Sequence, residues 1–147
     1  MVTVKGEKRT TTSVMRVISD ERSLIIFQLI AKASEKTTTN PNNAVNAQLL
    51  VSKINLTRKQ FYSRMSKLVS SGLVRRSCGN YELTSLGKIA YDVSALIDQA
   101  IQNHWKLKAI DALKSRSRSD ILDEERERII DALLENNRLK QILYSGL

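Results

Sequence analysis

The sequence predicts a mainly α-helical protein with one small β-hairpin. Aromatic residues make up only 5% of the 147 residues and there is one Pro, a composition that suits a modest helical core better than a sandwich or barrel. Apolar residues recur at helical spacing through most of the predicted elements. The exception is residues 73–83, where two short extended runs flank Cys78-Gly79-Asn80 and predict the hairpin.

The N-terminal part predicts an arm followed by helices. Residues 1 to about 13 are rich in Thr, Lys and Arg and show no apolar period, so we assign residues 1–18 to a flexible basic arm. The elements expected next are a core helix over residues 20–34 capped by Ser19 or Asp20, a polar loop over residues 36–43 and a short helix over residues 44–53.

A well-marked helix is expected from Thr57 to Ser71. Thr57 and Gln60 have the spacing of a capping box, and Gly72 should end the helix in a left-handed conformation. The opposite face is polar and basic, and its small hydroxyls between long cations would let the helix lie close to the floor of a DNA groove. A solvated helix face is the alternative. The residues expected to be buried are Phe61, Met65, Leu68 and Val69.

Positive charge is concentrated in the N-terminal half of the chain. The formal net charge is +9, and residues 1–80 hold 14 Lys and Arg against 4 Asp and Glu, whereas residues 81–147 hold 10 against 11. No acidic residue occurs between Glu35 and Glu82. Such a region favours a polyanionic partner, because neutralised phosphates release counterions. The alternative is a solubilising surface.

The predicted hairpin adds two cations to this half. Arg75 and Arg76 are neighbours in its first strand and should point to opposite faces, so at least one would meet a DNA backbone. Gly79 or Asn80 can supply the positive φ that a tight turn needs. Cys78 is either a redox-sensitive thiol or an ordinary exposed one.

Residues 56–74, LTRKQFYSRMSKLVSSGLV, and residues 81–87, YELTSLG, resemble archaeal winged helix-turn-helix transcriptional regulators over roughly residues 20–92. In these proteins the helix ending in Gly-Leu-Val enters the major groove, the hairpin flanks it as a wing, and Leu-Thr-x-x-Gly begins the next helix. The resemblance implies a winged-helix DNA-binding domain at residues 19–87. Thr84 should cap the following helix, and Gly87 should permit close packing against the hairpin.

We therefore expect a sequence-specific DNA-binding transcriptional regulator whose partner is double-stranded DNA. Two other functions remain open: a winged-helix protein-interaction module of the transcription or repair machinery, and a non-specific nucleic-acid-binding architectural protein. The candidate DNA-binding residues are Thr57, Arg58, Lys59, Gln60, Tyr62, Ser63, Ser66, Lys67, Arg75, Arg76 and Asn80.

Residues 88–147 are expected to form a helical, coiled-coil-like dimerisation region built from two long helices. One helix should run from Ser85 to about Lys114, with Asn103 interrupting its apolar stripe. The pair Ser117 and Asp120 has capping-box spacing and starts a last helix over residues 120–144, which packs on its own chain or on a partner. The candidate dimerisation residues are Ile89, Val93, Leu96, Ile97, Ala100, Ile101, Leu107 and Ile110.

No residue pattern indicates an enzyme, a cofactor or a metal site. One Cys and one His cannot form an internal disulfide or a structural zinc site, and no phosphate-binding Gly loop occurs. Trp105 is interpreted as a packing residue and His104 as a satisfied or solvated one, so a small-molecule effector is not indicated. No apolar run approaches the roughly 18 residues of a membrane span. We expect a cytoplasmic, nucleoid-associated homodimer.

Overall fold

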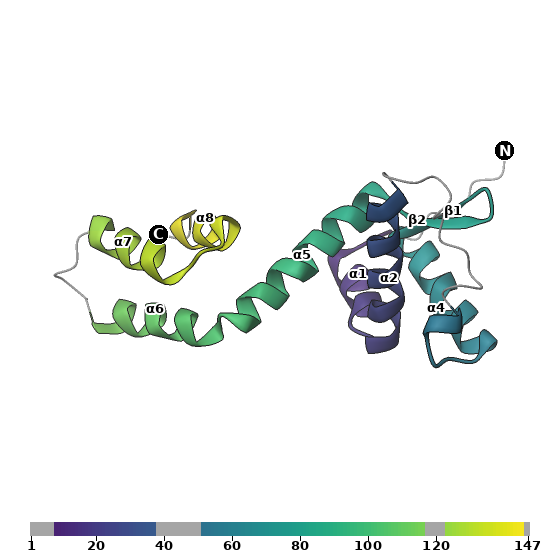
Figure 1. Cartoon of the computed structure of the whole chain (residues 1–147), viewed down its shortest axis with the longest axis horizontal. Helices are drawn as coiled ribbons and strands as arrows, with labels where there is room; N and C mark the ends of the chain where they lie inside the picture. The colour runs from purple at the N-terminus through teal and green to yellow at the C-terminus, as the bar shows by residue number, and fades with distance from the viewer. Residues whose placement is uncertain (1–7, 38–50, 117–122, 146–147) are drawn as a thin grey trace. The chain divides into compact units, whose positions relative to one another are not determined.

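The computed structural model of the chain describes residues 8–37, 51–116 and 123–145. Within these ranges the protein is mainly helical, with one two-stranded antiparallel sheet (Figure 1), which confirms the predicted fold class at this level. The chain divides into two compact units, Met1–Tyr91 and Asp92–Leu147.

The first helix, α1 (Thr11–Ile18), lies where a flexible arm was predicted, so that prediction is wrong for residues 11–18. A capping box starts the helix: the Thr10 hydroxyl accepts from the Ser13 amide at 3.1 Å, and the Ser13 hydroxyl accepts from the Thr10 amide at 3.0 Å. One side of α1 packs on the core of the first unit through half-buried Val14, Val17 and Ile18. The helix thus depends on a capping pair and a short apolar face. Residues 1–7 of the predicted arm lie outside the described residues.

The main core helix is α2 (Glu21–Thr37), which buries Ile26, Phe27 and Ile30 completely. Of the two cap candidates the structure selects Asp20, whose carboxylate accepts from the Ser23 amide at 3.0 Å and from the Ser23 hydroxyl at 2.7 Å. The predicted polar loop starts later than expected, because α2 continues to Thr37. The short helix predicted over residues 44–53 lies outside the described residues except for residues 51–53, which are helical.

The helix α4 (Arg58–Ser70) starts and ends as predicted. Its capping box is formed by Thr57 and Gln60, and Gly72 has φ +83° just beyond its end. Phe61, Met65 and Leu68 are buried. Val69 was also expected to be buried but is 38% exposed, because helical spacing puts it at the edge of the apolar face.

A tight hairpin follows, in which β1 (Val74–Ser77) pairs antiparallel with β2 (Asn80–Leu83) and Ser77 stands opposite Asn80. The two turn residues are Cys78, with φ 51°, and Gly79, with φ 80°. Positive φ at both positions is the requirement of a type I′ turn. The prediction that Gly79 or Asn80 would supply positive φ holds for Gly79, whereas the second such residue is Cys78 and Asn80 belongs to β2.

The start of α5 (Ser85–Gln102) is held tightly against the hairpin, as the sequence predicted. The Thr84 hydroxyl accepts from the Gly87 amide at 3.0 Å, and the Thr84 amide donates to the Leu73 carbonyl at 3.1 Å. A Cβ atom at Gly87 would lie 2.0 Å from that carbonyl oxygen, so only glycine permits this approach. Tyr91 also packs on the first core, its ring 6.2 Å from that of Phe27 in an edge-to-face arrangement.

The predicted long helix from Ser85 to Lys114 is wrong, because the chain breaks at Asn103 between α5 and α6 (His104–Arg116). The Asn103 side chain donates to the Gln99 carbonyl at 2.8 Å, and the Asn103 amide donates to the same oxygen at 3.1 Å. Short amide side chains compete in this way with the backbone hydrogen bonds of a regular helix. The Asn103 carbonyl then accepts from the Lys106 and Leu107 amides in the first turn of α6.

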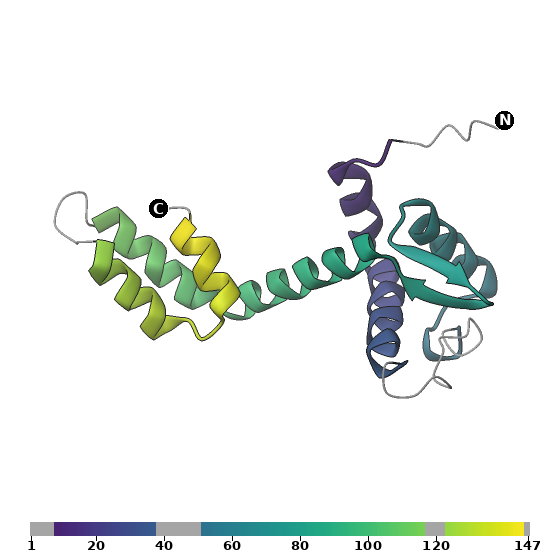
Figure 2. The ribbon, with the colours of Figure 1, turned by 90° about the horizontal axis from the view of Figure 1, so that it is seen from above.

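The described part of the predicted last helix over residues 120–144 is also two helices, α7 (Asp123–Leu133) and α8 (Asn137–Ser145). The described residues of this region therefore form four helices rather than two long ones (Figure 2). Asn136 caps α8, its side-chain oxygen accepting from the Arg138 amide at 2.9 Å and the Leu139 amide at 3.1 Å. The second core is a cluster of buried residues drawn from α6 to α8: Ile110, Ile130, Leu134 and Leu139. The proposed capping pair Ser117 and Asp120 lies outside the described residues.

Candidate nucleic-acid interface

The outward face of α4 carries most of the candidate DNA-binding residues, and all of them are exposed. Because Phe61, Met65 and Leu68 bury the opposite face, the helix has one apolar and one polar side. Among the described residues no acidic side chain pairs with Arg58, Lys59 or Lys67. The exposed candidates on this helix and its cap are Thr57, Arg58, Lys59, Gln60, Tyr62, Ser63, Ser66 and Lys67.

Two of these candidates already have a structural task. The Thr57 hydroxyl accepts from the Gln60 amide at 3.3 Å, and the Gln60 side-chain oxygen accepts from the Thr57 amide at 3.2 Å. Their oxygens are therefore used in holding the first turn of α4. The remaining outward residues combine cations with the small hydroxyls of Ser63 and Ser66 and with Tyr62, which is 51% exposed.

Arg64 is the one cation of α4 that faces inward. Its guanidinium Nε lies 3.0 Å from the Asp20 carboxylate, which anchors the middle of α4 to the start of α2. The pKa of Asp20 is lowered, chiefly by the hydrogen bonds from the Ser23 hydroxyl and amide and then by Arg64. Arg64 thus fixes how α4 is presented and is not part of its outward face.

The two hairpin arginines differ in their surroundings. Arg75 stands opposite Glu82 across the strands, with its Nε 2.5 Å from the carboxylate, so its charge is largely compensated. Arg76 stands opposite Tyr81 on the other face, its guanidinium 5.9 Å from the ring centre. A contact with a ring leaves the positive charge uncompensated. The expectation that the two point to opposite faces is confirmed, and Arg76 is the freer cation.

Two further residues of the hairpin were singled out from the sequence. Asn80 is half-buried in β2 and stands opposite Ser77. The sequence placed Asn80 in the turn, but in the structure it lies in the strand and not at the tip of the hairpin. Cys78 is at the tip, exposed and without a disulfide.

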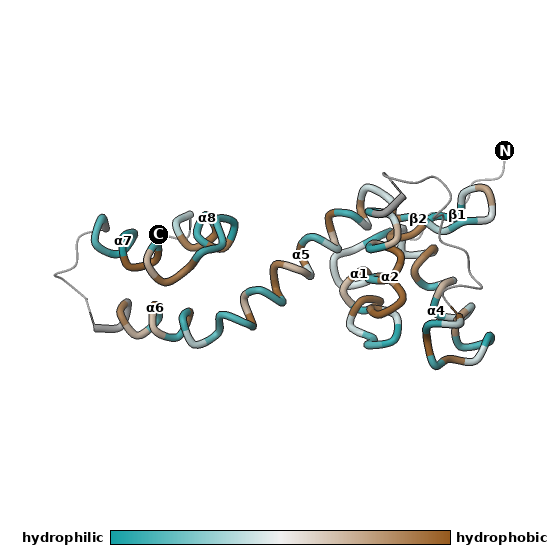
Figure 3. Tube along the Cα trace, viewed as in Figure 1, coloured by the Kyte–Doolittle hydropathy of each residue, from teal (hydrophilic) through white to brown (hydrophobic). Residues whose placement is uncertain are grey.

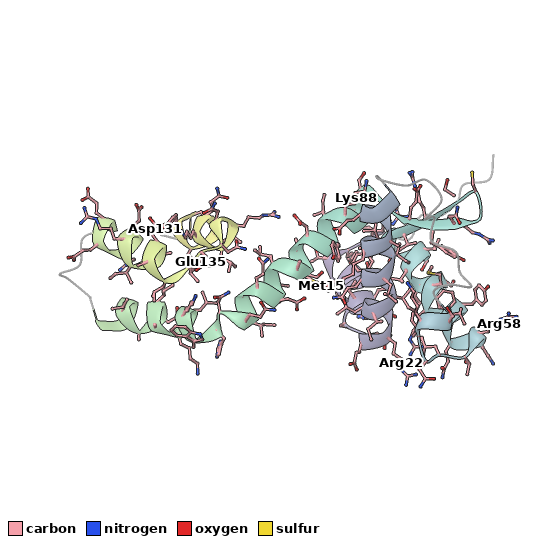
Figure 4. The ribbon with its side chains drawn as sticks, viewed as in Figure 1. Met15, Arg22, Arg58, Lys88, Asp131 and Glu135 are labelled. Atoms are coloured by element: carbon pink, nitrogen blue, oxygen red, sulfur yellow. The ribbon has the colours of Figure 1, made fainter. Side chains whose placement is uncertain are left out.

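Sequence reasoning missed Arg22 as a candidate cation. Arg22 is exposed in the first turn of α2, two residues after Asp20, and in Figure 4 it projects from the same end of the first unit as Arg58. No local pattern could have linked the two residues, because they are far apart in the chain and α2 meets α4 through tertiary packing, which includes the Arg64–Asp20 ion pair.

The predicted dimerisation residues separate into two groups. Leu96, Ala100 and Leu107 are partly buried against the second core, to which Ile110 belongs, and there they meet residues of α7 and α8 of the same chain. Their assignment to a partner interface stays a prediction. The other four are exposed: Ile89 (64%), Val93 (39%), Ile97 (49%) and Ile101 (66%). Trp105, expected to pack, is 64% exposed, with the Lys106 ammonium 5.6 Å from its ring centre. The last helices therefore fold on their own chain and leave one apolar line uncovered.

The described parts of the chain hold neither a metal-binding cluster nor a membrane-spanning helix. No group of three or more His, Cys, Asp or Glu side chains that could hold a metal ion occurs there. None of the helices described is both long and apolar enough to cross a membrane. In comparisons with known proteins, no family model, no curated protein and no solved structure matches the chain.

Proposed function

We propose that the first unit is a winged helix-turn-helix domain and that the protein is a sequence-specific, double-stranded-DNA-binding transcriptional regulator. The observation that carries this proposal is the outward face of α4, where three exposed cations have no ion-pair partner among the described residues and small hydroxyls lie between them. The hairpin that would be the wing packs directly on α4 and presents Arg76.

The proposed mechanism places α4 in the major groove. That groove, about 12 Å wide, admits a helix, and the short Ser63 and Ser66 side chains allow a close approach to the base edges. Lys59 and Arg58 would then reach guanine edges or phosphates, while Ser63 would bond to a base. Arg76 on the hairpin would meet the phosphate backbone, which fixes the register of the protein along the duplex.

The packing of the first unit supports this placement of α4 in the groove. The Arg64–Asp20 pair joins α4 to α2, and the Thr84 hydrogen bonds join Leu73, the residue before β1, to the start of α5. A helix that reads bases must be held firmly, because base hydrogen bonds tolerate little displacement. Glu82 in β2 reduces the charge that the hairpin presents at Arg75, which favours Arg76 as its main phosphate contact.

The test compares base reading with phosphate binding. Duplexes are selected by the protein from a random pool, and affinity for a selected and for a random duplex is measured over a range of salt concentrations. The variant Lys59→Ala with Ser63→Ala should weaken selected-duplex binding by about 1–3 kcal/mol for each side chain that reads a base, and random-duplex binding much less. Arg76→Ala should weaken both equally and lower the salt slope by about one unit.

Two controls sharpen this comparison. Lys32→Ala removes one charge from an exposed position on α2 that the proposal keeps out of the groove, and it should have little effect on either duplex. Arg75→Ala should cost less than Arg76→Ala, because Glu82 already compensates the Arg75 charge. Equal losses on both duplexes from the α4 variant would favour a non-specific architectural protein. An absence of DNA binding by the parent protein would favour a protein-interaction module.

A further inference from the structure

Arg22 is an exposed cation of the first unit that lies outside both the outward face of α4 and the hairpin. It belongs to the first turn of α2, and it has no ion-pair partner within the described residues. The Asp20 carboxylate nearby is already paired with Arg64. Glu21, the next acidic residue, points about 100° away around the helix, so the two side chains do not face each other. The positive charge of Arg22 is therefore available to a partner.

Tertiary packing holds the start of α2 beside α4. The Arg64 Nε lies 3.0 Å from the Asp20 carboxylate, so the chain two residues before Arg22 is fixed to the side of α4. In Figure 4 the Arg22 and Arg58 side chains project from the same end of the first unit, and Figure 3 shows hydrophilic stretches at the starts of both α2 and α4. The hairpin lies toward the other end of this unit in the same view (Figure 1). Arg22 and the hairpin are thus at opposite ends of the first unit.

We propose that Arg22 binds a phosphate of the DNA backbone and thereby positions α4 in the major groove, which rests on the function proposed above. A planar guanidinium can donate two parallel hydrogen bonds to a phosphate, so the chemistry of the side chain suits this ligand. Arg76 is the main phosphate contact of the hairpin, and Arg22 adds a second contact at the opposite end of the unit. Phosphate contacts fix register and orientation but carry no sequence information. Arg22 is therefore a positioning residue that reads no base.

The first test measures how salt affects binding to a selected and to a random duplex. Arg22→Ala should weaken binding to both duplexes by the same factor, because a phosphate contact carries no sequence information. It should also lower the salt slope by about 0.9, so that a fourfold rise in salt shrinks the parent-to-variant affinity ratio by about 3.5-fold. Arg22→Lys keeps the charge and should keep most of the slope. The matched control is Lys32→Ala, an exposed cation about 15 Å farther along the same helix, which should leave affinity and slope unchanged.

The second test locates the contact on the DNA. Single phosphates of the selected duplex are replaced in turn by uncharged methylphosphonates, and affinity is measured for the parent, Arg22→Ala and Arg76→Ala. One replacement that weakens the parent should have no effect on Arg22→Ala, because both changes remove the same interaction. A different replacement should have no effect on Arg76→Ala, since β1 of the hairpin and the start of α2 lie at opposite ends of the first unit.

The outcomes distinguish the role of Arg22 from the function of α4. If Lys59→Ala with Ser63→Ala weakens selected-duplex binding while Arg22→Ala keeps the parent's salt slope, the role of Arg22 alone is overturned. The same holds if Arg22→Ala binds weakly but every phosphate replacement keeps its cost, or if its circular dichroism shows lost helix, which would mean a structural role. An unchanged helical signal is expected, because Arg22 is exposed and has no ion-pair partner in the described ranges. A parent that binds no duplex would overturn both proposals.

Discussion

Replacing Gly87 by Ala should destabilise the first unit, although the same change elsewhere in a helix usually stabilises it. Ala is favoured over Gly in a helix interior by about 1 kcal/mol. At Gly87, however, the added Cβ would lie 2.0 Å from the Leu73 carbonyl oxygen and 3.4 Å from the Leu83 Cβ. Backbone atoms cannot rotate aside as a flexible side chain can, so the start of α5 must separate from Leu73, the residue before β1.

The size of the effect follows from that separation. An opening of about 1 Å stretches the hydrogen bond from the Thr84 amide to the Leu73 carbonyl, which measures 3.1 Å, beyond useful length. Overpacking costs about 1–3 kcal/mol and a broken hydrogen bond about 1 kcal/mol. After the helix-propensity gain of about 1 kcal/mol, we expect a net loss of about 1–3 kcal/mol.

Urea unfolding followed by circular dichroism measures this loss. Each kcal/mol corresponds to a fall in melting temperature of about 4–8 °C for a domain of this size. The matched control is Lys88→Ala at the next position, which is exposed in Figure 4 and should change stability by less than about 0.5 kcal/mol. A Gly87→Ala protein as stable as the parent, or more stable, would refute the close approach of α5 to β1.

Two further predictions concern titrating groups. The pKa of Asp20 in the folded protein lies below its usual 3.8, so ionised Asp20 stabilises the fold above that pH, and this contribution is lost as the pH falls through the lower folded pKa. Asp20→Asn should therefore narrow the difference between the unfolding free energies at neutral and at acidic pH. An unchanged difference would contradict this. The hydrogen bond to Asp131, 2.6 Å long, raises the pKa of Tyr144 to about 12, so its contribution is present below pH 10 and is lost as pH rises through about 12. Ultraviolet titration should show this late phenolate step, and Asp131→Asn should move it to lower pH; a step that does not move would contradict the assignment.

Local sequence determined the features that need only near neighbours. The capping box of α4 requires two side chains three residues apart, and the end of α4 requires a glycine at positive φ. The hairpin follows from two short extended runs and a turn that holds Gly79. The face of α4 was likewise predictable, because helical spacing alone separates the apolar side from Lys59, Ser63 and their neighbours.

Competition between local signals explains the errors in helix length. Asn103 and Asn136 can sit within a helix or end one, and their side-chain hydrogen bonds to Gln99 and to the start of α8 settle the choice here. The helix α1 was missed because its apolar face is short. Val14, Val17 and Ile18 stabilise the helix only when they pack on the first core.

Only the tertiary structure decided which charged side chains stay without an ion-pair partner among the described residues and which apolar side chains stay exposed. Arg64 and Lys59 look alike in the sequence, but packing brings Asp20 to Arg64 and no acidic partner within the described residues to Lys59. In the same way Leu96 and the adjacent Ile97 are both predicted dimerisation residues, yet Leu96 packs against the second core with α7 and α8, whereas Ile97 is exposed. The physical reason is that spacing fixes the face on which a side chain lies, whereas the segment that meets that face comes from residues far along the chain.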